Sequence, residues 1–236
     1  MGYIRAKDIV VEFPIYGTGS RSLKKTFIRA ATGGILEKDA ADHVLVRALD
    51  KISFEAREGD RIGLMGHNGS GKTTLLRVIA GAYEPVSGSI EVRGQIASML
   101  KITLGMDPEA TGRENIFLRG TVMGLRKREI EHMIDDIAEF AELGDYLDIP
   151  MRTYSSGMAM RLAFGVATSV SADIVLMDEW MSVGDKDFAV KGQARLQRLV
   201  DKAKILVLAS HDETLLKNNC SKILELSHGR LVPEHP

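Results

Sequence analysis

The amino-acid sequence predicts an α/β fold whose central sheet is largely parallel, with strands at the N-terminal side and an inserted helical subdomain. Continuous apolar runs at 174–177 and 205–209 are typical of parallel strands covered by helices on both faces. Each run is followed by a polar turn and a stretch with helical spacing, as in β-α units. Between about 112 and 170, apolar residues recur at helical intervals instead, which indicates the inserted helices.

The elements follow one another in a definite order. Strands are expected at 10–13, 51–55, 61–65, 89–92 and 96–100, before the two apolar runs. Helices are expected at 73–80, 112–124, 127–142 and 157–169. One face of the third helix carries Ile130, Ile134, Ile137 and Ala141, so we expect that face to be buried.

Composition limits the classes of protein to which the chain can belong. Its 236 residues can bury a substantial core, and we expect a single domain over 1–236. A formal net charge of −1 provides no global attraction to nucleic acid or anionic lipid, so no nucleic-acid partner is expected. The single cysteine, Cys220, excludes an internal disulfide and fits a reducing compartment.

Membrane-spanning and secretory segments are not expected. No stretch approaches the roughly 20 apolar residues that a transmembrane helix needs, and the first residues lack the apolar core of a signal peptide. We therefore expect a cytosolic chain that reaches a membrane only through a partner or a surface patch.

A glycine-rich loop with the pattern G-x-x-x-x-G-K-T follows the strand expected at 61–65. Glycines let such a backbone wrap closely around a polyphosphate, with several N–H groups directed at it. Lys72 would reach the β- and γ-phosphates, the Thr73 hydroxyl would hold Mg²⁺, and the following helix would present its positive end to the anion. A chance glycine-rich turn is disfavoured because strand, loop and helix are all in place. The predicted nucleotide-binding residues here are Gly66, His67, Asn68, Gly69, Ser70, Gly71, Lys72, Thr73 and Thr74.

Two carboxylates end the apolar run at 174–177. Asp178 and Glu179 should lie at the C-terminal edge of a buried strand, where ligands bind in open α/β sheets. Asp178 would then hold Mg²⁺, and Glu179 would polarise the attacking water. A strand that ends in a solvated acidic turn is the alternative, and the phosphate loop earlier in the chain makes it the weaker one.

The segment 154–158 carries a resemblance to a known family. It resembles the LSGGQ signature of ABC ATPases in altered form: Ser155 and Gly157 match, whereas Tyr154, Ser156 and Met158 depart from it. A serine hydroxyl and free N–H groups at a helix start, here at Ser155, Ser156 and Gly157, still form an anion site. Residues 182–185 resemble the family's D-loop, which includes Asp185, and His211 stands where the family keeps its switch histidine.

The resemblance covers about residues 8–232 and implies a nucleotide-binding subunit of an ABC transporter. The fold it implies is a P-loop NTPase (RecA-like) core with an N-terminal antiparallel β subdomain and an inserted helical subdomain. It implies ATP and Mg²⁺ as cofactors, and a homodimer in which the phosphate loop of one copy and the signature of the other enclose each ATP. Lys72, Glu179 and His211 would be the catalytic residues, and Thr73 and Asp178 the metal ligands. Tyr16 stands where the family stacks an aromatic ring on adenine, although a core role is a close alternative and Phe13 is nearby.

Three stretches narrow the type of transporter. Residues 106–116, 153–158 and 177–185 resemble exporters of lipid-linked polysaccharide, namely O-antigen, capsule and teichoic acid. Residues 21–25 and 66–69 favour the O-antigen branch (the Wzt type), here expected without the C-terminal carbohydrate-binding domain that some members carry. The implied partners are a pair of integral membrane permease subunits, with lipid-linked polysaccharide as the transported substrate. The subunit would lie peripherally at the cytoplasmic face of the bacterial inner membrane. An importer or drug-exporter subunit, or an ABC protein acting on DNA or ribosomes, is the alternative.

The sequence departs from the wider family at one loop. Most ABC ATPases have a glutamine about six residues before the proline that matches Pro108; it contacts Mg²⁺ and the membrane subunit. Here that place falls at Ile102, and Gln95 is the nearest glutamine. Because isoleucine cannot bind a metal, our hypothesis is that packing takes over the coupling role of this loop.

Residues 17–47 form an insertion before the next expected strand. Leu23, Phe27 and Ala31 recur on one face of a predicted short helix, opposite the basic residues Arg21, Lys24, Lys25 and Arg29. Such a helix suits either anionic headgroups or a partner, and a solvated helix packed on the core is an equal alternative.

Overall fold

The computed structural model describes residues 2–15, 35–38, 44–180 and 186–233. These residues form two compact units. The first contains Met1–Ile96, Leu176–Trp180 and Lys204–Pro236, and the second contains Ala97–Val175 and Met181–Ala203. The second unit is wider than the helical subdomain expected at 112–170, because the helix after the predicted D-loop belongs to it.

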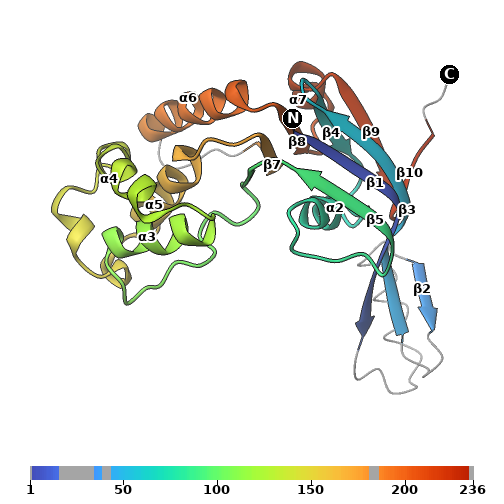
Figure 1. The fold of residues 1–236 in the computed structure, drawn as a ribbon, viewed down its shortest axis with the longest axis horizontal. Helices are drawn as coiled ribbons and strands as arrows, with labels where there is room; N and C mark the ends of the chain where they lie inside the picture. Colours follow the sequence, from blue (N-terminus) through green and yellow to red (C-terminus); the bar gives the residue numbers. More distant parts are fainter. Residues whose placement is uncertain (1, 16–34, 39–43, 181–185, 234–236) are drawn as a thin grey trace. The chain divides into compact units, whose positions relative to one another are not determined.

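An antiparallel sheet of the first unit has the strand order β2-β3-β1-β5 (Figure 1). Its strands are β1 (Tyr3–Ile15), β2 (Ile35–Lys38), β3 (Val44–Arg57) and β5 (Ser87–Arg93). β1 and β3 pair from Tyr3↔Arg57 to Ile15↔Val44, with irregularities in register between Ala6 and Glu12. Each such irregularity interrupts the alternation of apolar residues, which explains why the sequence reveals only 10–13 and 51–55 of these long strands.

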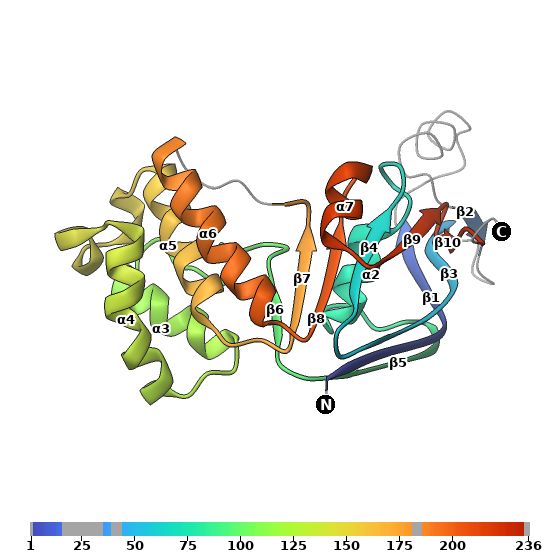
Figure 2. The same cartoon turned by 90° about the horizontal axis from the view of Figure 1, so that it is seen from above.

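A six-stranded sheet has the order β10-β9-β4-β8-β7-β6 (Figure 2). Its strands are β4 (Arg61–Met65), β6 (Ile96–Ser98), β7 (Ile174–Asp178), β8 (Ile205–Ala209), β9 (Lys222–Ser227) and β10 (Arg230–Leu231). β4 lies between β8 and β9 and is parallel to both. All five residues of β8 are buried, as the continuous apolar run predicts. The predicted α/β fold is confirmed.

Two helices of the first unit pack beside this sheet. α2 (Lys72–Ile79) follows the glycine-rich loop and buries Leu75, Leu76, Val78 and Ile79. α7 (Glu213–Asn219) lies close to β4: a Cβ on Gly63 would be 3.2 Å from the Leu216 side chain. The central strand before the loop is thus held by neighbours on each side, and the position of the loop is fixed by the sheet.

The second unit is built from α3 (Gly112–Val122), α4 (Lys127–Ala141), α5 (Ser156–Ser169) and α6 (Lys186–Lys202). The face predicted to be buried on α4 is buried, with Ile130, Ile134, Ile137 and Ala141 each at most 7% exposed. These residues pack with Ile116 of α3 and with Leu162 and Val166 of α5.

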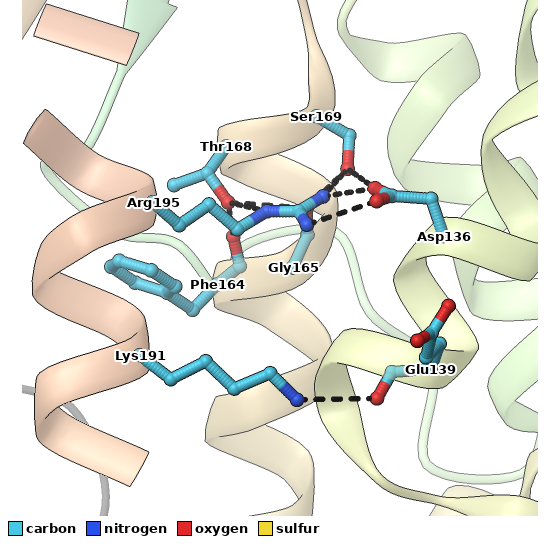
Figure 3. A network of polar contacts seen from close by, with 8 residues as sticks. All are labelled: Asp136, Glu139, Phe164, Gly165, Thr168, Ser169, Lys191 and Arg195. Atoms are coloured by element: carbon cyan, nitrogen blue, oxygen red, sulfur yellow. Dashed lines mark hydrogen bonds and ion pairs between the residues drawn. The ribbon is translucent and has the colours of Figure 1, made fainter. Parts of the chain in front are cut away.

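Arg195 of α6 joins three helices of this unit (Figure 3). Its Nε donates to Thr168 Oγ1 at 3.0 Å, and its guanidinium forms an ion pair with Asp136 of α4 and donates to Ser169 Oγ at 2.6 Å. The guanidinium also lies over the Phe140 ring, 4.4 Å from its centroid. Hydrogen bonds from Arg195 hold the pKa of the Asp136 carboxyl below its ordinary value, so this ion pair is charged at neutral pH.

The predicted insertion at 17–47 is described only in part. Its end differs from the expectation, since 35–38 form β2 and β3 already begins at Val44. The basic amphipathic helix predicted from Arg21 to Ala31 lies outside the described residues, as do Tyr16 and Asp185. Among the residues that the structure does describe, no helix is both long enough and apolar enough to span a membrane.

Candidate functional site

The glycine-rich loop connects the end of β4 at Met65 to the start of α2 at Lys72. Gly66 and Gly71 have φ angles of +147° and +111°, and a Cβ on Gly66 would lie 2.2 Å from the Leu226 carbonyl oxygen. Only glycine allows this close backbone approach. No side chain caps the first N–H groups of α2. These N–H groups are therefore available to an anion in the loop.

Lys72 places a positive charge inside the curl of the loop. Its side chain is largely buried, and Nζ donates to the carbonyl oxygens of Gly66 at 2.6 Å and His67 at 3.1 Å. The buried hydroxyl of Ser70 has no hydrogen-bond partner among the described residues. The loop thus combines a cation with unused polar atoms, which is the chemistry that a polyphosphate requires.

The predicted metal ligands lie next to each other. Thr73 Oγ1 donates to Asp178 Oδ2 at 2.6 Å, although the two residues are far apart in the sequence. Mg²⁺ takes oxygen ligands, commonly one or two from the protein, and completes its shell with water and phosphate oxygens. The pair fits this requirement, and no cluster of three or more candidate metal ligands exists within the described ranges.

Glu179 and His211 also lie together. His211 Nδ1 is 2.9 Å from Glu179 Oε1, and the His211 backbone N–H donates to the same oxygen at 3.2 Å. The other oxygen, Oε2, accepts from Ser210 Oγ at 2.7 Å. Burial of the carboxylate opposes its ionisation, but the hydrogen bonds from Ser210 and His211 outweigh burial and keep the pKa of Glu179 below its ordinary value. The side chain is therefore an anion at neutral pH.

The backbone at Glu179 is unusual as well. Its φ angle is +73°, a left-handed conformation that is uncommon for residues other than glycine, and its N–H donates to Ala209 O at 2.8 Å. Strained residues of this kind gather at functional sites, where the surrounding structure holds them in place.

A cavity lies between the phosphate loop and the two carboxylates Asp178 and Glu179. Its volume of about 490 Å³ is within the range usual for small-molecule sites. It is lined by Asn68, Gly69, Ser70, Gly71, Lys72, Thr73, Thr74, Asp178 and Glu179, and by Phe13, Val46 and Ala48 of the antiparallel sheet. Phe13 and Val46 are paired across β1 and β3. Because Tyr16 lies outside the described residues, Phe13 is the aromatic residue that the structure places at the cavity.

Sequence reasoning missed Ser210, Val46 and Ala48. The hydroxyl of Ser210 donates to Glu179 and accepts from the Asp212 N–H at 3.1 Å, so it holds the carboxylate in place. A serine that ends a buried strand beside the predicted histidine was the available signal. Val46 and Ala48 belong to a strand whose start was not recognised.

A comparison with protein-family models agrees with this arrangement. The ABC transporter family model matches residues 49–182, more than half of the chain. The chain belongs to the ABC transporter family. ATP hydrolysis is the activity expected of it, and the match includes the phosphate loop, the altered signature and the two carboxylates.

Several curated ABC proteins are similar over most of the chain. An O-antigen export system ATP-binding protein of Yersinia enterocolitica is 44% identical over 97% of this chain and 95% of its own length. A second O-antigen export protein, from Myxococcus xanthus, is 39% identical over 93% of this chain, which spans 50% of that relative. A teichoic acids export ATP-binding protein of Bacillus anthracis is 35% identical over 97% of this chain and 40% of its own length.

Solved ABC structures support the fold. The ATP-binding subunit of an ABC transporter superposes with a TM-score of 0.66 at 20% identity, over 97% of this chain and 87% of the other. A dimeric bacterial ABC transporter cassette gives the same TM-score at 20% identity, over 97% and 96% of the two chains. At this level of identity the similarity establishes the shared fold.

The altered signature lies in the second unit, whereas the cavity is formed by the first. Ser155 caps the N-terminus of α5, where its hydroxyl accepts from the Met158 N–H at 3.2 Å. Ser155 and Ser156 are exposed, and Gly157 is partly exposed. The predicted helix start is therefore present, with its N–H groups near the surface.

The loop position without glutamine also lies in the second unit. Ile102 is 3% exposed, so its side chain packs in the interior. Gln95 is exposed, in the short turn between β5 and β6. The hypothesis that packing takes over the coupling role of this loop stays a prediction.

Proposed function

We propose that this chain is the ATP-hydrolysing subunit of an ABC transporter that exports lipid-linked O-antigen across the bacterial inner membrane. The observation that carries the proposal is the cavity, because the phosphate loop, Asp178 and Glu179 all line it and a phosphoryl-transfer site needs these groups together. The O-antigen cargo is supported by the Yersinia enterocolitica relative, because the two chains match over nearly their whole lengths.

In this proposal the residues act mainly by positioning and by neutralising charge. Lys72 and the loop N–H groups hold the β- and γ-phosphates, and Phe13 packs against the base. Thr73 and Asp178 would hold Mg²⁺, which would neutralise phosphate charge when bound. Glu179 accepts a hydrogen bond from the attacking water, because Ser210 and His211 keep it anionic and aimed.

The second half of the site comes from another copy of the chain. Ser155 and Gly157 at the start of α5 supply a hydroxyl and N–H groups to the γ-phosphate of the opposite subunit. ATP closes the homodimer, hydrolysis reopens it, and the movement drives a pair of membrane permease subunits. The subunit then works at the cytoplasmic face of the membrane, held there by the permease.

The Glu179→Gln variant tests the catalytic assignment. It keeps the shape of the side chain but cannot accept a proton, so we expect normal MgATP affinity and hydrolysis slowed by at least 100-fold. It should also accumulate as a dimer with ATP, measured by size-exclusion chromatography with light scattering. Glu225→Gln, an exposed change on β9, is the matched control. Hydrolysis at the wild-type rate by the Glu179→Gln variant would remove Glu179 from the mechanism.

Teichoic acid is the second candidate cargo, favoured by the 35% identity to the Bacillus anthracis exporter subunit. O-antigen is preferred because the Yersinia enterocolitica relative has the higher identity, 44% over 97% of this chain. Co-purification with the permease, followed by ATPase assays with each lipid-linked polymer, separates the two. Stimulation by the teichoic acid precursor alone would replace the O-antigen proposal.

A further inference from the structure

The hairpin that joins β9 and β10 contacts the phosphate loop through a backbone hydrogen bond. Gly229, at the tip of the hairpin, donates its N–H to Ser70 O at 2.9 Å. Its own carbonyl oxygen accepts from the Asp50 N–H of β3 at 2.8 Å. One glycine therefore connects the phosphate loop to the antiparallel sheet through its backbone alone.

The backbones meet too closely for a side chain at this junction. Gly229 has a φ angle of +78°, and a Cβ there would lie 2.7 Å from Ala48 O. A Cβ on Gly71 would lie 2.9 Å from the same oxygen. Loop, hairpin and β3 thus converge on Ala48.

An ion pair anchors the hairpin beside this junction. Arg230 Nε donates to Asp50 Oδ2 at 2.7 Å; the Asp50 side chain is only 4% exposed, whereas that of Arg230 is 64% exposed. Arg47 lies 3.6 Å from the other oxygen of Asp50. A buried carboxylate with charged partners is held strongly, so the hairpin is fixed relative to β3.

The bond to Ser70 determines where the next N–H group of the loop points. The Ser70 carbonyl and the Gly71 N–H belong to one planar, trans peptide group, so they point in opposite directions. Because the carbonyl is turned toward Gly229, the Gly71 N–H is turned away from the hairpin. Gly71 is one of the residues that line the cavity.

We propose that Gly229 is a positioning residue for the phosphate loop, with the Asp50–Arg230 ion pair as its anchor. The hairpin orients the Ser70–Gly71 peptide so that its N–H is ready for a phosphate oxygen before nucleotide arrives. Such preorganisation strengthens binding because no reorientation is needed on contact. The inference rests on the ATP site proposed above.

The Gly229→Ala variant is the first test, with Gly81→Ala as its matched control. Gly81 has nearly the same φ, +73°, but nothing lies within 4 Å of its Cβ position, so the control carries the backbone strain without the clash. We expect MgATP affinity, measured by titration of a fluorescent ATP analogue, to fall about tenfold in Gly229→Ala and by less than twofold in Gly81→Ala. Without nucleotide, the melting temperature should fall more in Gly229→Ala than in Gly81→Ala, because only Gly229→Ala adds the clash with Ala48 O.

A second, milder variant tests the proposal even if Gly229→Ala does not fold. Arg230→Met removes the ion pair with Asp50 by a change to an exposed side chain. We expect the KM for ATP to rise about threefold, with a smaller change in kcat. Arg230→Lys should recover part of this loss. Arg5→Met, which removes an exposed ion pair with Glu55 between β1 and β3, should leave KM unchanged.

The outcomes separate the two proposals. If the wild-type chain binds no ATP, the proposed function fails and this inference fails with it. If the wild type binds ATP, but Gly229→Ala matches Gly81→Ala and Arg230→Met matches Arg5→Met, the positioning role alone is overturned.

Discussion

Ser210 shows how a single hydroxyl determines the state of a predicted catalytic group. It is completely buried, donates to Glu179 Oε2 and accepts from the Asp212 N–H. A buried hydroxyl with both functions satisfied has one orientation, so it fixes the carboxylate that it touches. Glu179 needs this support because its backbone is in a left-handed conformation.

Replacement of Ser210 by alanine tests this support. Loss of the hydroxyl leaves Glu179 Oε2 with one partner fewer, so we expect kcat for ATP hydrolysis to fall about tenfold while the KM for ATP changes little. Steady-state kinetics measure the two constants separately. Ser169→Ala, which removes a hydroxyl from the Arg195 network in the second unit, is the control and should leave kcat intact. An equal loss in both variants would point to general destabilisation.

At the scale of elements, two of the stretches that resemble polysaccharide exporters, 106–116 and 153–158, have a structural role. Thr111 and Glu114 form a capping box at the start of α3. Asn115 is fully buried, and its side-chain amide donates to the carbonyl oxygens of Asp107, Ala110 and Thr111 and accepts from the Asp107 N–H. In the stretch 106–116, hydrogen bonds from Asn115 and the capping box therefore hold the loop against the start of α3.

The start of α3 also packs against Tyr154, the first residue of the altered signature. A Cβ on Gly112 would lie 2.2 Å from the Tyr154 hydroxyl oxygen, and that hydroxyl donates to Tyr146 O at 2.5 Å. Tyr154 directly precedes Ser155, the N-cap of α5. The two stretches noted separately in the sequence are thus complementary in shape, and together they fix the start of α5.

The Gly112→Ala variant tests this complementarity. The added methyl clashes with Tyr154, and overpacking of about 1–3 kcal/mol should lower the melting temperature by roughly 5 °C. Combination with Tyr154→Phe, which removes the clashing oxygen, should restore part of the loss. Gly192→Ala on α6 is the control, since its nearest neighbour would be 3.7 Å away and alanine favours helices. No recovery in the double variant would contradict the proposed fit.

Elements with a local signal were predictable, and elements that depend on tertiary contacts were not. The phosphate loop, β8 and α4 have patterns that are complete within a few residues. Most of β1 and β3 was missed because irregular register hides their alternation. Gly229 and Ser210 could not be assigned roles, because each acts through a partner far away in the sequence. The position of Asp178 was predictable because it ends a recognisable strand.

At the scale of the whole molecule, every residue of the cavity belongs to the first unit. A ligand that binds only the folded state stabilises it, by about 2.7 kcal/mol at one hundred times its dissociation constant. Nucleotide should therefore stabilise the first unit directly.

Thermal unfolding measures this effect. In the Glu179→Gln background, which prevents turnover, we expect saturating MgATP to raise the melting temperature by about 5–10 °C. Removal of Mg²⁺ by EDTA should reduce the shift, because Thr73 and Asp178 then lose the ion they would share. A further Lys72→Ala change should abolish it. A shift that persists in the Lys72→Ala chain would mean that ATP binds elsewhere.

The neighbours of β4 have a consequence for synthesis of the chain. The strand that carries the phosphate loop pairs with β8 and β9, and the loop itself rests on Gly229. A ribosome completes the G-x-x-x-x-G-K-T sequence early, yet the supports of that loop are made only about 150 residues later. Before then β4 cannot pair with both β8 and β9. A nascent chain of that length therefore contains the phosphate-loop sequence but not the folded nucleotide site. ATP can therefore bind and stabilise the completed fold, but it cannot stabilise the early folding intermediates, which lack the site.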